Sequence, residues 1–484
     1  MKPIPLFGFG VTAESALMTS QRRVNVLYEI KQDGDKAQIV IRGTPGTTLF
    51  IDLSTANGAV RGLHNFISRN LLFAVVGNIL YEITLAGTAT NRGSITAGTN
   101  FVAMEDNGTQ LLILDGTKGW IYNANTHVLT QIADPNFPQT AKSVAYDSNF
   151  FLVDDTAVNP GQFRKSASFD GTTWPATDLG IFSSSSNSLV RVYALGGAVI
   201  LFGSLNIEFW QIVGGAGFPY SPIKSSASPY GLAARWSIAP IEDTIGFLGQ
   251  NQQGHVSIFK LQGYIPIRIS TQDIDTIIND FSTVSDAVSI GYVNDGHVVY
   301  QITFPTARRS FIFDQTTQMW GEVQTGVGIT GRHFCNLGVG FGSQFYCGDA
   351  TVGKIYQLNS ESFTDNGMTI PRLLQTRHVF VDYNIIGIDE LFLDIETGIG
   401  LQSGQGSTPQ LMLQVSKDNG RTFGTERWVS FGAVGQYLDH RAIWRRFGTG
   451  RDFVFRWQMT DPVKFVVTGG GIVAKLGTDN GRNN

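Results

Sequence analysis

Strand-like segments recur along this chain at a nearly constant spacing, and this spacing limits the folds that the chain can adopt. Each segment is an aromatic or aliphatic run that leads into a polar turn and a second run. The segments begin at positions 80, 121, 167, 209, 258, 312 and 355, at intervals of 41 to 54 residues. A period of about 40 to 50 residues is typical of β-propellers, in which each repeat forms one blade. Because one blade cannot bury both of its faces, we expect the repeats to stack around a ring.

The sequence leaves the number of blades open at six or seven. The longest interval, 54 residues, is long enough to contain an insertion. Two repeats, over residues 169–174 and 313–320, resemble the end of a kelch repeat, in which an Asp turn precedes a Trp that packs between blades. A β-rich chain can also produce such matches by chance, and this alternative stays open.

One segment has the pattern of a helix. Apolar residues at positions 274, 277, 278 and 281 have the i, i+3, i+4, i+7 spacing of a helical face. Ser270 or Thr271 can cap the start of this helix, because a hydroxyl oxygen accepts a hydrogen bond from a free amide of the first turn. We expect the helix to pack on the edge of a blade.

The pattern changes after about residue 372. Longer strands are expected over residues 388–395, 410–415 and 453–459, as in a β-sandwich. We therefore predict an all-β protein, a six- or seven-bladed β-propeller with a C-terminal β-sandwich. Its parts are an N-terminal arm with the first strands (1–55), for which packing on the C-terminal domain is left open, the propeller (56–372), the sandwich (373–476) and a disordered polar tail (477–484).

Composition excludes several classes of protein. A hydrophobic content of 42% excludes a disordered chain, and a net charge of −4 argues against strong, non-specific binding to nucleic acid or acidic membranes. The longest apolar run, residues 192–203, is shorter than the roughly 20 residues that span a bilayer, so we expect no membrane span. Prolines and glycines in the first ten residues do not fit a signal peptide, so we expect a protein used without that route of secretion.

The chain contains two cysteines, Cys335 and Cys347. Two cysteines are too few for a disulfide framework and for the four ligands of a structural zinc site. Free thiols in a reducing cytosol are the simpler interpretation, and the sequence leaves open whether the two pair.

No motif for catalysis or cofactor binding occurs in the sequence. The seven histidines lie more than five residues apart from one another, so no local metal-binding spacing exists. Neither a nucleophile elbow nor a phosphate-binding loop is present. We predict no catalytic residue, no metal ligand and no cofactor, and therefore a protein that is not an enzyme.

One motif points to an alternative function. Residues of the loop after position 415 match the Asp-box of sialidases and related propellers, in which the Asp side chain satisfies turn amides and an aromatic ring packs beneath, so the motif itself is structural. A sialidase would also need an arginine trio and a Tyr/Glu pair at the propeller centre. A carbohydrate-binding or glycan-cleaving propeller is thus the alternative. The Asp-box residues are Ser416, Asp418, Gly420, Thr422 and Phe423.

Arginines and tryptophans cluster near the end of the chain. These residue types are enriched in the hot spots of protein interfaces, and also in platforms for single-stranded nucleic acid. Because the chain as a whole is acidic, we favour contact with protein. Arginine stacked on tryptophan inside the sandwich, a purely structural role, is the alternative. The candidate interface residues are Arg427, Arg441, Trp444, Arg445, Arg446 and Arg451.

Three parts of the chain, in order, resemble one family of proteins. They are residues 20–29 (SQRRVNVLYE) with 42–46, residues 246–249 with 263–271 (GYIPIRIST), and residues 441–448 (RAIWRRFG) with Arg451 and Asp461-Pro462. These parts resemble the opening, central and closing segments of the packaged-DNA stabilisation proteins, also called tail hub or nozzle proteins, of short-tailed bacteriophages. The likeness is patchy, but its order extends along nearly the whole chain.

The resemblance implies a structural virion protein and no enzyme. Such a protein would dock as a six-fold ring below the portal and adaptor, retain packaged DNA and form the channel for its ejection. The implied partners are further copies of the chain, portal and adaptor proteins, tailspike, fibre or needle proteins, and passing double-stranded DNA without sequence-specific binding. The implied location is the virion tail, and the host cytoplasm during assembly.

Overall fold

The computed structural model describes residues 20–30, 39–56, 58–182, 188–214, 217–224, 227–328, 331–437 and 441–476. Regular structure in these ranges is almost entirely β-strand, with one α-helix and the short 3-10 helices η1 (Ser54–Ala56) and η2 (Ile67–Arg69). Within the same ranges, no helix is long and apolar enough to cross a membrane. The expectations for residues 1–19 and for the tail at 477–484 lie outside the described residues.

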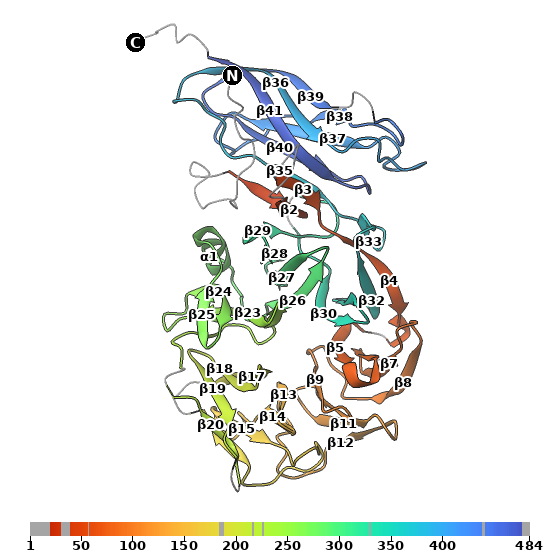
Figure 1. Ribbon diagram of the computed structural model, residues 1–484, viewed down its shortest axis with the longest axis vertical. Helices are drawn as coiled ribbons and strands as arrows, with labels where there is room; N and C mark the ends of the chain where they lie inside the picture. The colour runs from red at the N-terminus through yellow and green to blue at the C-terminus, as the bar shows by residue number, and fades with distance from the viewer. Residues whose placement is uncertain are drawn as a thin grey trace.

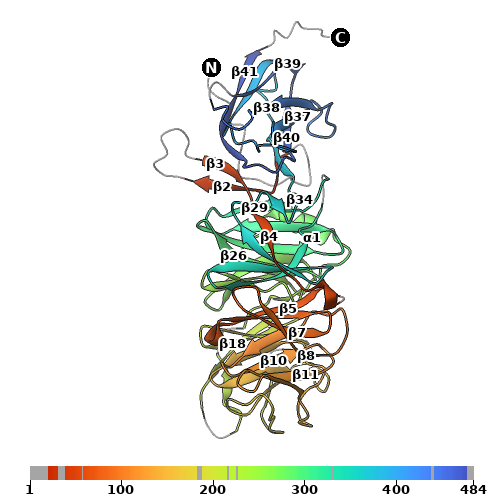
Figure 2. The ribbon, with the colours of Figure 1, turned by 90° about the vertical axis from the view of Figure 1, so that its right-hand side faces the viewer.

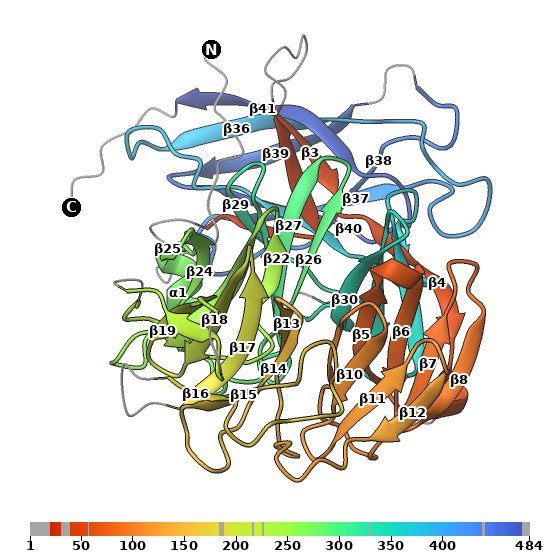
Figure 3. The same cartoon turned by 60° about the horizontal axis from the view of Figure 1, so that its bottom comes forward.

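Antiparallel sheets form a ring, which confirms the predicted β-propeller (Figures 1 and 3). Seven such sheets lie in the described ranges, and the first four follow chain order. They are β5 (Val60–Phe66), β6 (Leu71–Val76), β7 (Ile79–Ile83) and β8 (Ala89–Ser94); β9 (Ala103–Asp106), β10 (Gln110–Leu114), β11 (Gly119–Asn123) and β12 (Val128–Gln131); β13 (Val144–Asp147), β14 (Phe150–Asp154), β15 (Gln162–Lys165) and β16 (Leu179–Ile181); and β17 (Leu189–Leu195), β18 (Ala198–Gly203), β19 (Ile207–Ile212) and β20 (Tyr220–Pro222).

The remaining three sheets complete the ring. The fifth contains β21 (Gly231–Leu232), β22 (Ala239–Ile241), β23 (Thr244–Gln250), β24 (Val256–Gln262) and β25 (Ile265–Arg268); the sixth contains β26 (Val288–Asn294), β27 (His297–Phe304), β28 (Arg309–Asp314) and β29 (Met319–Glu322); the seventh contains β30 (Cys335–Phe341), β31 (Gln344–Asp349), β32 (Lys354–Asn359) and β4 (Gly46–Asp52). Because β4 precedes the other propeller strands in sequence, the ring is closed by pairing of its first strand with one of its last. In that pairing Leu49 lies opposite Tyr356 and Thr47 opposite Leu358.

The repeats seen in the sequence correspond to one strand of each sheet. Positions 80, 121, 209, 258, 312 and 355 fall in β7, β11, β19, β24, β28 and β32, each the third strand of a four-strand propeller unit. Position 167 lies just after β15, in an isolated bridge between Ala167 and Asp170. The spacing of the repeats in the sequence therefore corresponds to the succession of sheets around the ring.

The tryptophans of the two kelch-like repeats pack between neighbouring sheets, as predicted. Trp174 is 1% exposed and lies in one cluster with Leu112 of the second sheet and Phe151 of the third. Trp320 is 3% exposed and joins the clusters of the fifth and sixth sheets. Both indole N–H groups are satisfied, each donating to a backbone carbonyl at 2.8 Å.

The predicted helix is present as α1 (Gln272–Asn279). The Thr271 hydroxyl caps it by accepting a hydrogen bond from the Ile274 amide at 3.4 Å. Ile274 and Ile278 are fully buried in the same cluster as Ile258 of β24. The helix thus covers the fifth sheet.

The C-terminal part is a β-sandwich that continues from the rim of the ring (Figure 2). Its core contains Phe455, Trp444 and Trp457, each 3% exposed or less. The short hairpin of β33 (Thr364–Asp365) and β34 (Met368–Thr369) connects it to the seventh sheet. One sandwich sheet contains β1 (Arg22–Val24), β35 (Arg372–Gln375), β40 (Val454–Met459), β37 (Gln410–Ser416) and β38 (Arg427–Ser430), and the other contains β2 (Val26–Ile30), β3 (Ile39–Gly43), β41 (Val466–Leu476), β36 (Ile386–Ile395) and β39 (Ala442–Gly450).

The N-terminal strands join the two domains. Strand β1 pairs with β29 of the sixth sheet on one side and with β35 of the sandwich on the other, so a single nine-stranded sheet extends from the ring into the sandwich. Strands β2 and β3 add to the second sandwich sheet, where β3 pairs with β41. The segment that ends with β4 therefore contributes to both domains.

Asn25 lies at the centre of this junction, between β1 and β2. It is 2% exposed and has a φ of 56°, a left-handed conformation that Asn tolerates better than most residues. Its side chain donates to the carbonyls of Gln324 (2.9 Å) and Pro371 (2.7 Å) and accepts from the Gln324 amide (2.9 Å). Its backbone amide donates to Glu322 at 2.8 Å, and its carbonyl accepts from Thr44 at 2.9 Å. Asn25 thus links the sixth sheet to Pro371, just before β35, and to Thr44, between β3 and β4.

An ion-pair cluster lies beside Asn25. Glu322 is 5% exposed and accepts two hydrogen bonds from Arg22, at 2.8 and 2.9 Å, and one from Arg309 at 2.9 Å. Arg22 comes from β1, and Arg309 begins β28 of the same propeller sheet as Glu322. The Glu322 carboxylate therefore joins β1 to the propeller through Arg22, and it pairs with Arg309 within its own sheet.

A buried acid near the same junction makes folding depend on pH. Asp365 is 2% exposed and accepts hydrogen bonds from Thr325 (2.5 Å) and Thr47 (3.3 Å). Burial raises the pKa of Asp365 to about 7, although these hydrogen bonds and the nearby Arg372 act in the opposite direction. At pH values between 3.8, the ordinary pKa of this side chain, and about 7, the folded chain therefore retains a proton on Asp365 that the unfolded chain releases.

We expect the contribution of Asp365 to the free energy of unfolding to fall as the pH rises from about 4 to about 7, and to be constant above. The variant Asp365→Asn removes this contribution and keeps a side-chain oxygen that accepts hydrogen bonds. Urea unfolding of both proteins at several pH values measures the effect as the difference between them. A difference that does not change with pH would contradict this assignment.

Candidate functional site

The arginines predicted as an interface lie along β38, β39 and the segments beside them. Arg441 pairs with Asp394 (2.8 Å) and stacks 4.2 Å from the ring of Phe392, and Arg445 pairs with Glu390 (2.9 Å). Both arginines are about half exposed or more, with 47% and 64% of the side chain accessible. These contacts cross the outer face of the sheet between β36 and β39.

Two of the other predicted arginines donate to backbone carbonyls. Arg427 donates to the carbonyls of Arg445 and Arg446 and lies 5.0 Å from the ring of Phe447. Arg451 donates to the carbonyl of Tyr383 at 2.9 Å. The exposed guanidinium of Arg446 has no hydrogen bond or ion pair with any residue in the described ranges.

The structure places the predicted Trp444 inside the sandwich. Its side chain is 3% exposed, its ring lies 6.4 Å from that of Trp457, and its N–H donates to the Arg427 carbonyl at 3.0 Å. This residue therefore offers no surface to a partner. Trp428, which the sequence analysis did not select for the interface, is 55% exposed on the edge strand β38.

The Asp-box residues form a tight turn after β37. Asp418 accepts hydrogen bonds from the amide of Thr422 (2.9 Å) and from the hydroxyls of Thr422 (2.5 Å) and Ser416 (2.6 Å). Gly420 has a φ of 79°, which glycine adopts without steric cost. The Phe423 ring lies 3.5 Å below the Arg456 guanidinium. Each polar group of the motif is thus used within the turn.

A cavity of about 410 Å³ lies on the axis of the ring, lined by residues from the inner part of each sheet. Arg191 of β17 projects into it, held by the Arg235 carbonyl (2.8 Å) and by the ring of Trp236 (5.3 Å). Burial lowers the pKa of Arg191 to about 10 and raises the pKa of Glu105, which lines the same cavity. Neither residue makes an ion pair within the described ranges.

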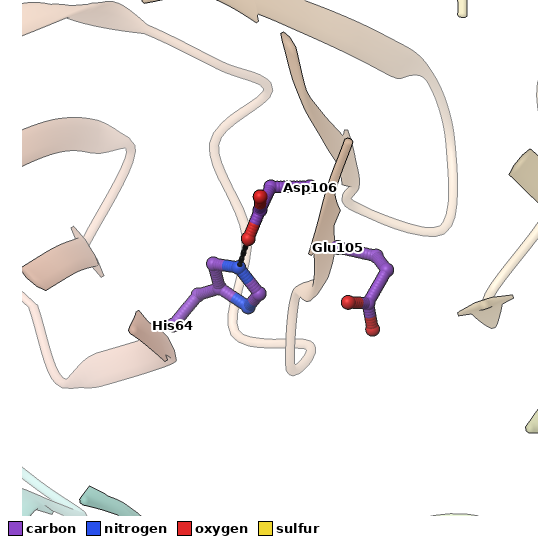
Figure 4. Close-up of side chains that lie close together, drawn as sticks. All are labelled: His64, Glu105 and Asp106. Atoms are coloured by element: carbon purple, nitrogen blue, oxygen red, sulfur yellow. Dashed lines mark hydrogen bonds and ion pairs between the residues drawn. The ribbon is translucent and has the colours of Figure 1, made fainter. Parts of the chain in front are cut away.

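Close to this cavity lie the groups that could hold a metal ion. The ligand atoms of His64, Glu105 and Asp106 are within 4.8 Å of one another. His64 Nε2 and Asp106 Oδ2 form a hydrogen bond of 2.7 Å, and Figure 4 shows the Glu105 carboxylate standing apart from this pair. A second histidine, His297, forms a similar pair through Nδ1 with Asp314 Oδ2 at 2.8 Å.

The axial cavity also bears on the alternative of a glycan-cleaving propeller. Glu105 and Tyr193 both line it, as a Tyr/Glu pair would require. Among the described residues that line the cavity, however, Arg191 is the one arginine, where a sialidase needs three. The described lining of the cavity therefore offers one arginine, not the trio of that alternative.

Sequence reasoning gave no role to the residues of the domain junction. Arg22 and Asn25 stand in the segment that resembles the phage family, but their partners, Glu322 and Gln324, are about 300 residues later in the chain. A repeat or a local motif carries no signal for such pairs. The one available sign was the run of four polar residues at 20–23.

Two family models match the chain by sequence. The model described as "Bacteriophage P22 Gp10, beta-propeller" matches residues 2–363, and the model described as "Bacteriophage P22 Gp10, beta-sandwich" matches residues 371–475. The boundary between the two matches falls where the chain leaves the seventh sheet for β35, although β1–β3, within the first match, belong to the sandwich sheets. No curated protein matches the chain by sequence.

Solved structures similar in shape are distant in sequence. The match to the Neurospora crassa Pan2 WD40 domain includes 65% of this chain and 96% of that domain, with 8% identity and a TM-score of 0.42. The match to the N-terminal domain of Nup159 includes 70% of this chain and 99% of that domain, with 8% identity and a TM-score of 0.42. The extracellular domain of a hybrid two component system from B. thetaiotaomicron covers 66%, with 8% identity and a TM-score of 0.44, and this chain spans 40% of it.

Proposed function

The chain belongs to the bacteriophage P22 Gp10 family, and from this premise we propose that it acts as a tail hub, or nozzle. The family assignment makes it a phage structural protein concerned with the stabilisation of packaged DNA, and so a component of the virion. Our proposal adds that the chain docks as a six-fold ring below the portal and adaptor, retains packaged DNA and forms the channel for its ejection. Assembly would take place in the host cytoplasm.

The observation that carries the proposal is the pair of family matches, which together cover both domains in order. The domain junction is consistent with such a role. A sheet shared between ring and sandwich, together with the buried contacts of Asn25 and Glu322, leaves little freedom for one domain to move against the other. A protein in the wall of a pressurised channel needs this kind of rigidity.

The edge of the sandwich where β38 and β39 lie side by side supports the proposed contact with other proteins. It combines exposed arginines with the exposed ring of Trp428, and these residue types dominate the energetics of protein interfaces. The net charge of −4 for the whole chain favours passage of DNA over tight binding, because tight binding requires many lysines and arginines at phosphates. Tailspike, fibre or needle proteins are the further partners of the proposal.

The proposed role requires no enzymatic activity. The one arginine among the described residues that line the axial cavity, and the internal hydrogen bonds of the Asp-box, are consistent with this. Incubation of the purified chain with sialosides and other glycans should give no turnover. Hydrolysis that is lost in the variant Glu105→Gln would instead establish the glycan-cleaving alternative.

We expect the double variant Trp428→Ala, Arg446→Ala to bind a purified portal–adaptor complex at least about tenfold more weakly than the unmodified chain. Both side chains are exposed and Arg446 is free of other contacts in the described structure, so stability should change by less than about 1 kcal/mol. Affinity is measured by surface-immobilised binding, and stability by urea unfolding.

The matched control is Arg69→Ala, which removes an exposed arginine at the end of η2 in the propeller. Its affinity should equal that of the unmodified chain. Equal binding by the double variant would remove this face from the docking site, and no binding by the unmodified chain would refute the hub proposal itself.

A further inference from the structure

The two cysteines of the chain face each other across two neighbouring strands of the seventh sheet. Cys335 begins β30, and Cys347 lies in β31. The register places Cys335 opposite Asp349 and Gly338 opposite Cys347, with a bulge between Cys335 and Leu337. The cysteines are thus a diagonal pair on one face of the sheet, and the glycine opposite Cys347 leaves this side without a competing side chain.

The two sulfur atoms are very close. Cys335 Sγ lies 2.8 Å from Cys347 Sγ, whereas two non-bonded heavy atoms are best separated by about 3.5 to 4.0 Å. The side chains are 1% and 2% exposed and belong to the apolar cluster that joins the sixth and seventh sheets. The backbone therefore already holds the sulfur atoms near bonding distance.

The surroundings argue against other uses of these thiols. Burial, the second cysteine and the acids Asp365 and Asp349 all raise the pKa of the Cys335 thiol, so the thiolate needed for catalysis or metal binding is disfavoured. The group of possible metal ligands in the described ranges lies elsewhere, at His64. Pairing with each other is the chemistry that remains for them.

We propose that Cys335 and Cys347 form a disulfide bond when the protein meets an oxidant. Two S–H bonds break and one S–S bond forms, with the release of two protons and two electrons. Dissolved dioxygen accepts them to give hydrogen peroxide, or a small-molecule disulfide accepts them to give two thiols. The bond would be absent in the reducing cytoplasm and would form after release from the cell.

The timing of bond formation rests on the proposed virion role, but the bond itself does not.

The effect of the disulfide on stability follows from its place in the seventh sheet. Strands β30 and β31 begin the sheet that β4 completes, and the cross-link closes a loop of 12 residues in the sequence. Closing a loop lowers the conformational freedom of the unfolded chain, so the bond should stabilise the sheet at which the ring closes.

The test uses the full-length chain, refolded with and without oxidised glutathione. Trypsin leaves both cysteines on one peptide, residues 333–354. After refolding with the oxidant, this peptide should weigh less by two hydrogen atoms, and titratable thiols should fall from two per chain to none. In the native protein the same reaction should be much slower, because both thiols are buried. Thiols that stay free after refolding, or that form mixed disulfides with glutathione, would overturn the proposal.

The second readout is stability. The oxidised chain should unfold at a temperature about 5 °C higher than the same chain with reductant. The variants Cys335→Ser and Cys347→Ser should show no dependence on reductant, whatever their own stability. Because the chemical test needs only the unmodified chain, variants that fail to fold do not affect its outcome. If the disulfide forms but the chain does not bind the portal–adaptor complex, the hub proposal is refuted and the disulfide proposal stands.

Discussion

Replacing Asn25 with alanine is expected to lower the free energy of unfolding by about 3 to 5 kcal/mol. The substitution leaves two carbonyls and one amide, of Gln324 and Pro371, without their partner in a buried place. Each unsatisfied buried group costs about 1 to 3 kcal/mol. Alanine also adopts the left-handed conformation at φ 56° less readily than Asn, which adds about 1 kcal/mol. Urea unfolding, followed by circular dichroism, measures the loss.

The matched control is Asn70→Ala. Asn70 has nearly the same backbone conformation, with φ 52°, but its exposed side chain makes no hydrogen bond in the described structure. We expect it to lose only the conformational part, about 1 kcal/mol. Equal effects of the two variants would mean that the side-chain contacts of Asn25 contribute nothing to stability.

Replacing Glu322 with alanine is the second substitution with a large expected effect. It removes the acceptor of three charged hydrogen bonds from Arg22 and Arg309, whose side chains are 12% and 22% exposed. Breaking a buried ion pair from one side costs about 3 to 5 kcal/mol. Because these contacts hold β1 on the propeller, proteolysis between ring and sandwich should also become faster. Unfolding by urea and limited proteolysis measure the two effects.

Glu396→Ala is the control for this substitution. Glu396 pairs with Lys464 at 3.0 Å, but both side chains are exposed, at 38% and 51%. Exposed pairs contribute about 0 to 1 kcal/mol, so its effect should lie in that range, with proteolysis unchanged. A Glu322 variant that behaves like this control would show that the cluster does not hold the domains together.

Much of the fold could be predicted because its signals are local. The spacing of the propeller sheets, Trp174 and Trp320 between them, the Thr271 cap of α1 and the change of pattern before the sandwich each depend on neighbouring residues. The N-terminal strands could not be placed in this way. Their pairing is decided by residues hundreds of positions away, for which one sequence gives no spacing rule.

The candidate interface was harder to predict for a second reason. In a regular strand, residues two apart share a face, so Trp444 and Arg446 would lie on the same side. Arg446 instead has a φ of 64° and lies where the register of β39 shifts against β36. This shift turns Arg446 outward while Trp444 stays in the core. A single sequence does not show where a strand contains an extra residue.

Closure of the ring by β4 sets an order of events on the ribosome. The partner strand β32 ends at Asn359, so the first strand of the propeller must wait for most of the chain to be translated. At about 5 to 20 residues per second, this delay is roughly 15 to 60 s. During that time β4 has no native partner to bind, and in the same segment only the β2–β3 hairpin can pair early. The nascent protein therefore depends on chaperones or on its own solubility until synthesis is nearly finished.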